Sequence, residues 1–288
     1  MKRRNFLKTF GVATASVSMA FYNPLSAEVL KDKKLPHFGI ILGNTGGEWL
    51  KQNPKEALRK IAEAGYKELE FGGDIGLKMT PSELGKYLKS LGLKAVIGPT
   101  TMAAMNDTEK LKSDIKECRE RGQKYIVCYW PWTDDGKNKQ LDDWKRVAEN
   151  LNKGGAICRK EGVQLIYHNH DIEFKLTEEK IPFDTLMAHL DPALVGIEFD
   201  LYWITKGGQS PVDYIRKYPG RYPVFHVKDM KPSDRDFACV GSGCIDFPEI
   251  FKLNDISGAK HFIVEHDHPE NPKECIESSA KYLSNIRL

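Results

Sequence analysis

The sequence lacks several signatures that would define its class at once. None of its cysteine pairs has the two-residue spacing of a zinc knuckle or a redox motif. No glycine-rich phosphate loop follows the first expected strand, at 37–42, which argues against a dinucleotide-binding sheet. The sequence also has no basic excess beyond its N-terminus. Four of the 43 basic residues lie in the first eight positions, and the other 39 are balanced by 40 acidic residues. The folded part is therefore nearly neutral, and nucleic acid is not expected as a partner.

The spacing of the six cysteines does not define a disulfide framework. They are Cys118, Cys128, Cys158, Cys239, Cys244 and Cys275. Three of them fall in expected helices and one in an expected strand, where a buried cysteine behaves as a small apolar side chain. The short separation of Cys239 and Cys244 would allow these two to pair in an oxidising compartment.

The N-terminus has the three parts of an export signal. Basic residues at positions 2–8 precede an apolar run at 9–21, and small residues follow, with cleavage expected after Ala27. Thirteen apolar residues are too few to span ~30 Å of hydrocarbon as a helix, so no permanent membrane anchor is expected. The pair Arg3-Arg4, followed by Phe-Leu-Lys, resembles a twin-arginine signal. We therefore expect residues 1–27 to be recognised by the twin-arginine export machinery and the mature chain, 28–288, to be periplasmic.

The mature chain alternates short β-branched and aromatic runs with longer amphipathic stretches, which is the pattern of βα units around a parallel sheet. Eight strands are expected, at 37–42, 68–71, 94–97, 125–129, 163–168, 195–200, 224–227 and 261–265. The intervening helices include 54–64, 81–91, 109–121, 141–161, 211–217 and 272–285. Eight strands with their crossovers favour one closed (β/α)8 TIM barrel, for which about 250 residues is the usual size.

Polar side chains concentrate at the ends of the last four expected strands. They read Tyr167-His-Asn-His170, Glu198-Phe-Asp200, His226-Val-Lys228 and Glu265-His-Asp267. Because the active site of a parallel barrel lies at the C-terminal ends of its strands, these residues are the candidates for its chemistry.

Strand alternation places one residue from each of these ends on the barrel axis: His168, Asp200, His226 and Glu265. Two imidazoles and two carboxylates suit a divalent transition metal, and manganese, zinc and cobalt are all admissible. His170 has the same phase as His168 and is an alternative ligand.

At these residues the chain resembles the xylose isomerase-like superfamily of sugar isomerases and epimerases. The resemblance rests on Tyr-His-Asn-His170 with Asp171 and Glu173 beyond it, on Asp200-x-x-Trp203, on His226-Val-Lys-Asp229, and on Val240-Gly-Ser-Gly243 and Val264-Glu-His-Asp267. It implies the same four metal ligands. In epimerases of this group the fifth-strand ligand is a glutamate that pairs with the eighth-strand glutamate as a second acid/base group. This chain has His168 there, which argues against two-base epimerisation.

The chemistry shared across the group is removal of a proton next to a carbonyl. Glu265 and His170 are the candidate bases, and Lys228 is a candidate for stabilising an enolate oxygen. Glu173, Trp203 and Trp130 are candidates for binding a carbohydrate. Because phosphorylated sugars are mainly cytoplasmic, export favours a non-phosphorylated substrate.

Three functions remain open on the sequence. The first is isomerisation or epimerisation of a free sugar. The second is a lyase or dehydratase that uses the same enolisation followed by β-elimination, for example on a 3-keto-glycoside or an inosose. The third is a non-catalytic sugar-binding barrel. DNA repair of the endonuclease IV type is disfavoured by the export signal and the neutral charge, and a homo-oligomer remains open.

Overall fold

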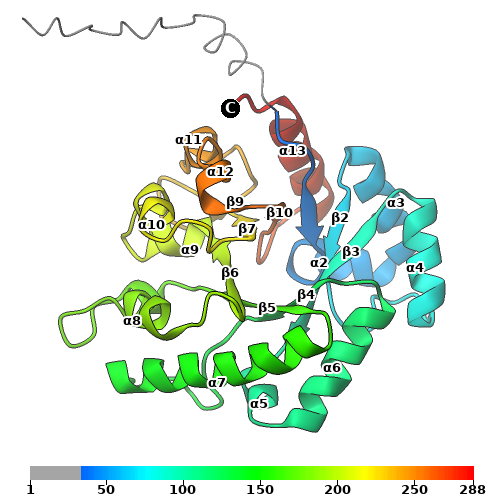
Figure 1. Cartoon of the computed structure of the whole chain (residues 1–288). Coiled ribbons are helices and arrows are strands. Elements are labelled where there is room, and N and C mark those ends of the chain that lie inside the picture. The colour runs from blue at the N-terminus through cyan, green and yellow to red at the C-terminus, as the bar shows by residue number, and fades with distance from the viewer. Residues whose placement is uncertain (1–33) are drawn as a thin grey trace, which may run out of the picture.

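The computed structural model describes residues 34–288, so the expected signal at 1–27 lies outside the described residues. The chain forms a closed eight-stranded parallel barrel in the order β1-β10-β7-β6-β5-β4-β3-β2. Figure 1 shows the strands at the centre and the helices around them. The expected TIM barrel is confirmed.

The barrel strands coincide with the eight expected segments to within a few residues. They are β1 Gly39–Ile41, β2 Glu68–Glu70, β3 Lys94–Thr100, β4 Tyr125–Cys128, β5 Gln164–His168, β6 Val195–Asp200, β7 Val224–Val227 and β10 His261–Val264. The expected first strand was too long at its C-terminal end, because Leu42 already begins a helix.

The expected helices are also present, and further short helices lie between them. They are α2 Leu42–Gln52, α3 Pro54–Ala64, α4 Pro81–Ser90, α5 Met102–Met105, α6 Thr108–Glu120, α7 Leu141–Lys160, η2 Ile172–Phe174, α8 Pro182–His189, α9 Leu201–Lys206, α10 Pro211–Lys217, α11 Phe247–Phe251, α12 Asn254–Ser257 and α13 Pro272–Asn285. Proline opens several of them, where its missing N–H costs no hydrogen bond. Within residues 34–288 no helix combines the length and apolarity needed to cross a membrane.

Side chains alternate between the two faces of the barrel strands, except at Val96 and Ile97 of β3, where the pairing with β2 shifts register. Outward residues pack under the helices in one large apolar core, whereas a smaller cluster fills the barrel interior: Ile41, Val96, Ile97, Tyr125, Val127, Ile166, Val224 and Ile263. The same inward phase carries the histidines and carboxylates at both ends of the barrel.

A short antiparallel ribbon, β8 Asp229–Met230 with β9 Phe237–Ala238, follows β7 and leads into a tight loop. The carboxylate of Asp229 organises this loop by accepting hydrogen bonds from the backbone N–H groups of Gly241, Gly243 and Ile245 at 2.9, 2.9 and 3.2 Å. A Cβ at position 243 would lie 2.2 Å from Asp229 Oδ1, so the close approach requires glycine. The Val240-Gly-Ser-Gly243 motif is thus explained by the loop.

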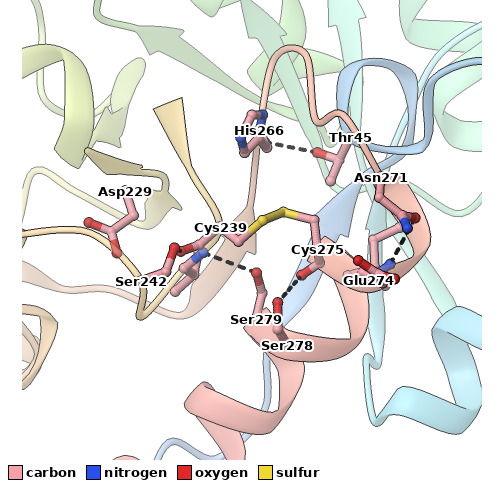
Figure 2. The surroundings of a disulfide bond; sticks show 12 residues. Thr45, Asp229, Cys239, Ser242, His266, Asn271, Glu274, Cys275, Ser278 and Ser279 are labelled. Atoms are coloured by element: carbon pink, nitrogen blue, oxygen red, sulfur yellow. Dashed lines mark hydrogen bonds between the residues drawn. A yellow bond between two sulfur atoms is a disulfide. The ribbon is translucent and has the colours of Figure 1, made fainter. Parts of the chain in front are cut away.

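A disulfide fastens this loop to the last helix. Cys239, directly after β9, is bonded to Cys275 in the first turn of α13 (Figure 2). The backbone N–H of Val240 also donates to Ser279 Oγ on α13 at 3.1 Å. The pairing of Cys239 with Cys244, which the sequence left open, does not occur, because α13 brings Cys275 to Cys239 and Cys244 is free and exposed.

Removing the disulfide by the double change Cys239→Ser and Cys275→Ser is expected to lower the free energy of unfolding by about 2–4 kcal/mol, because the bond closes a chain loop of 36 residues. Thermal unfolding without reductant measures the loss. Cys244→Ser is the matched control and should melt with the wild type. Equal melting temperatures for the double variant and this control would contradict a stabilising bond.

Candidate active site

A cavity of about 720 Å³ opens at the C-terminal ends of the strands, where a barrel enzyme has its active site. Its size is typical of small-molecule sites. Its lining combines polar groups from four strand ends with residues of α2 and of the segment after β2. The residues that line the cavity include Leu42, Asn44, Leu50, Ile75, Tyr129, His168, His170, Trp203, Lys228, Glu265 and Asp267.

The structure brings together the four residues expected to bind metal, named here the upper cluster: His168, Asp200, His226 and Glu265. One ligand atom from each lies within 4.8 Å of the others, and all four residues are buried. His168 Nε2 is 3.8 Å from Asp200 Oδ2, and His226 Nδ1 is 3.0 Å from Glu265 Oε2. Alternation along β5, β6, β7 and β10 is sufficient to explain this convergence.

Two further carboxylates hold the imidazoles of the upper cluster. Glu198 Oε2 lies 3.0 Å from His168 Nδ1, and Glu70 Oε2 lies 3.0 Å from His226 Nε2. Each histidine therefore keeps one nitrogen on a carboxylate and turns the other toward the cluster, the usual arrangement of metal-binding histidines. The sequence pointed to Glu198 as a strand-end residue without assigning it this role, and it did not point to Glu70, although the expected strand 68–71 contains it.

The upper cluster fits a divalent metal. Asp200 Oδ1 caps α9 by accepting from the N–H of Trp203 at 2.8 Å, but the buried Oδ2 has no hydrogen-bond partner. Burial raises the pKa of Asp200 to about 7, and burial with the charge of Glu70 raises that of Glu198 to about 8. The protein's own groups thus leave these buried charges incompletely compensated, and a cation among two imidazoles and two carboxylates would offset them.

Lys228 extends the charged array toward the cavity. Its side chain is buried, and Nζ lies 2.8 Å from Asp267 Oδ1 and 3.3 Å from Glu265 Oε2. Although burial opposes its charge, the surrounding carboxylates raise its pKa, so the side chain stays an ammonium. Asn44 of α2 donates to both Glu265 and Asp267, at 2.9 and 3.2 Å, and was not anticipated from the sequence.

His170 lies beside the upper cluster and lines the cavity. Its ring centroid is 4.8 Å from that of His168, and its Nδ1 is buried without a hydrogen-bond partner. Burial lowers its pKa to about 4, so the imidazole is neutral near pH 7 and can accept a proton.

Glu173 lies beneath His170 and not in the cavity, contrary to its expected contact with substrate. The carboxylate is fully buried, accepts from the hydroxyl of Tyr167 and accepts from the backbone N–H of His170 at 2.9 Å. It therefore positions the segment that carries His170.

The two tryptophans expected to bind carbohydrate differ in their placement. Trp203 lines the cavity, with its ring centroid 5.3 Å from that of His170 and Lys228 Nζ 5.0 Å from the ring. Trp130 packs edge-on against the other side of His170 at 5.3 Å, but it is 42% exposed and lies outside the cavity lining. The structure thus offers Trp203, and not Trp130, to a ligand in this cavity.

Comparison with known proteins identifies relatives of the same fold. A family model described as xylose isomerase-like TIM barrel matches residues 58–286. An inosose dehydratase of Clostridium beijerinckii is 25% identical over 273 residues, covering 80% of this chain and 88% of the relative. One from Clostridium botulinum is 29% identical over 269 residues, with coverage of 80% and 88%. A sugar phosphate isomerase/epimerase structure from Parabacteroides distasonis is 26% identical with a TM-score of 0.75, covering 88% and 95%.

Proposed function

The chain belongs to the xylose isomerase-like TIM barrel family, and from this premise we propose that it is a carbon–oxygen lyase that acts on a non-phosphorylated keto-carbohydrate. The observation that carries the proposal is the placement of His170 and Lys228, which line the same cavity and both pack against the ring of Trp203. A base beside a cation is what removal of a proton next to a carbonyl requires. The inosose dehydratases that resemble this chain support an elimination.

The charge of the cavity supports a substrate without phosphate. Its acidic side chains include Asp74, Glu265 and Asp267, and its lysines are Lys51 and Lys228. Both lysines already contact carboxylates, Lys51 with Glu48 at 2.8 Å and Lys228 with Asp267. The carboxylates of the lining outnumber its lysines, which disfavours a phosphate dianion.

One part of the cavity wall is apolar and includes Leu42, Leu50 and Ile75. A second group attached to the keto-sugar ring would be accommodated there, which favours a keto-glycoside among the candidate substrates. A bare inosose would leave this wall uncovered.

A divalent metal held by His168, Asp200, His226 and Glu265 would act as a Lewis acid on an oxygen of the substrate. His170 removes the proton from the carbon next to the carbonyl, and the C–H electron pair forms the enolate. Lys228 donates hydrogen bonds to the enolate oxygen as its charge develops. Glu173 holds the backbone of His170 in place for this transfer.

The elimination balances with a single acid/base group. When the carbonyl re-forms, the electron pair of the enolate becomes the new carbon–carbon double bond and the β carbon–oxygen bond breaks. The departing oxygen takes the proton that His170 carries, which returns the imidazole to its neutral form. No second carboxylate base is needed, in keeping with His168 at the fifth-strand position.

Isomerisation or epimerisation is the second candidate, and the Parabacteroides distasonis structure described as a sugar phosphate isomerase/epimerase favours it. The same enolisation would be the first step of this reaction, but the proton would then return to a carbon atom instead of leaving with the departing oxygen. His170 would then have to deliver it.

The proposal is tested by assaying metal-stripped protein recharged with manganese, zinc or cobalt against four substrates. These are an inosose, a 3-keto-glycoside, a free ketose and a ketose phosphate. We expect released water or aglycone and an enone absorbance from the first or second substrate, and none before metal is added. Turnover of the free ketose or its phosphate alone would contradict the proposed class.

Replacing Lys228 with Met is expected to lower kcat/KM by roughly 10²–10³-fold, because loss of a preorganised charge beside the developing enolate removes transition-state stabilisation. Bound metal should be retained, since Lys228 is not a ligand. Lys231→Met, at a side chain 47% exposed, is the matched control. A loss of activity no greater than in this control would rule out a role for the ammonium.

We also propose that the protein is exported to the periplasm through its twin-arginine signal. The Cys239–Cys275 disulfide supports this, because such bonds persist in oxidising compartments. Changing Arg3 and Arg4 together to Lys should leave the protein in the cytoplasm, as cell fractionation would measure. Unchanged export of that variant would point to a different route.

A further inference from the structure

The opposite end of the barrel holds a second group of potential metal ligands, named here the floor cluster: His37, Glu68 and His261. His37 precedes β1, Glu68 begins β2 and His261 begins β10. These strands are neighbours, because β1 pairs with both β2 and β10. The three side chains therefore meet at the N-terminal end of the seam that closes the barrel.

The phase of the strands directs all three side chains inward. His261, Ile263 and Glu265 alternate with outward residues on β10, just as Glu68 and Glu70 do on β2. Ile263 belongs to the apolar cluster that fills the barrel interior. This apolar layer separates the floor cluster from the upper cluster, so the two groups are independent sites.

The ligand atoms of the floor cluster lie close together. His37 Nε2 is 3.2 Å from Glu68 Oε1, and His261 Nδ1 is 2.8 Å from Glu68 Oε2. All three ligand atoms lie within 4.8 Å of one another. Ligands at zinc bond lengths of about 2.0–2.2 Å are separated by less than about 4.4 Å, so a small adjustment would suffice.

One detail indicates a site for more than a hydrogen bond. His37 Nε2 is shielded from solvent and has no hydrogen-bond partner, although it is turned toward Glu68. Gly39 allows the close approach of the β2 backbone at Glu68, since a Cβ at position 39 would lie 2.7 Å from the Glu68 carbonyl oxygen and 2.8 Å from Glu68 Cβ. The His37 side chain is 33% exposed, which gives an ion access from solvent.

We propose that the floor cluster is a second site for a divalent transition metal, with zinc as the ion that suits two imidazoles and one carboxylate. Three protein ligands leave a fourth position open on the solvent side. A bound ion would tie the residue before the first strand to the first residue of the last, and so stabilise the closure of the barrel. The site is independent of the proposed lyase activity.

The test counts metal in untagged full-length protein charged with Co²⁺ and freed of excess ion by gel filtration. The double variant His37→Gln with His261→Gln should carry one equivalent of cobalt less than the wild type, by elemental analysis. Glu265→Gln should lose a different equivalent, that of the upper cluster. His189→Gln, at an exposed histidine outside both clusters, is the matched control. An equal cobalt content in the double variant and this control would overturn the proposal. The three side chains would then form a hydrogen-bonded group that binds no metal.

A second measurement covers failure of the double variant to fold. Zinc added to protein carrying His168→Gln and His226→Gln, which remove both imidazoles of the upper cluster, should raise its melting temperature, because an ion that binds only the folded state stabilises it. X-ray absorption of that sample should show two imidazole nitrogens and a carboxylate around zinc. A melting temperature unchanged by zinc, or a shell without imidazole, would overturn the site.

Discussion

The variant His170→Gln is expected to bind metal like the wild type while its kcat falls by roughly 10²–10⁴-fold, the usual contribution of a general base. His170 lies beside the upper cluster but contributes no atom to it. Glutamine retains a polar side chain of similar reach and cannot accept the proton. The measurement is kcat on whichever of the four assayed substrates the wild type turns over, with metal content determined on the same sample.

The neighbouring histidine provides the comparison for this variant. His168→Gln removes a member of the upper cluster, so it should lose metal and activity together. Loss of metal from His170→Gln would instead make His170 a ligand and leave Glu265 as the remaining candidate base.

The variant Glu265→Gln is expected to lose both its metal and at least about 10³-fold in kcat/KM, which corresponds to about 4 kcal/mol of transition-state stabilisation. Glutamine preserves the shape of the side chain but removes the charge that lies 3.0 Å from His226 and 3.3 Å from Lys228. Elemental analysis and steady-state kinetics on the same preparation measure the two losses.

Asp267→Asn separates the role of Glu265 in metal binding from a general effect of charge. Asp267 shares Lys228 and Asn44 with Glu265 but does not belong to the upper cluster. It should therefore retain its metal. If both variants kept a full complement of metal, Glu265 would not be a ligand.

The fold and the upper cluster could be predicted from the sequence because both follow from local patterns. Alternation within β5, β6, β7 and β10 determines which side chains face the axis, and barrel closure then brings them together whatever the details of the loops. The C-terminal limit of the first strand was harder to predict, since Leu42 continues the apolar run of the strand, whereas the chain already turns into α2 at this residue.

Contacts between distant segments could not be predicted in the same way. Cys239 and Cys275 are 36 residues apart, and their pairing depends on how α13 packs beside the loop after β9. Glu70 and Asn44 come from the first two βα units, which barrel closure places beside β10, at sequence separations of 156 from His226 and 221 from Glu265. The buried position of Glu173 depends on the turn of η2, which no periodic pattern indicates.

The measurement that tests the central claim most directly is proton NMR of the turnover in deuterated water, with metal-loaded protein and a non-phosphorylated keto-glycoside or inosose. We predict signals of an unsaturated ketone together with released aglycone or water, and their loss in His170→Gln. Deuterium incorporated next to the carbonyl of an otherwise intact or isomerised substrate, with nothing eliminated, would contradict the lyase and establish the isomerase.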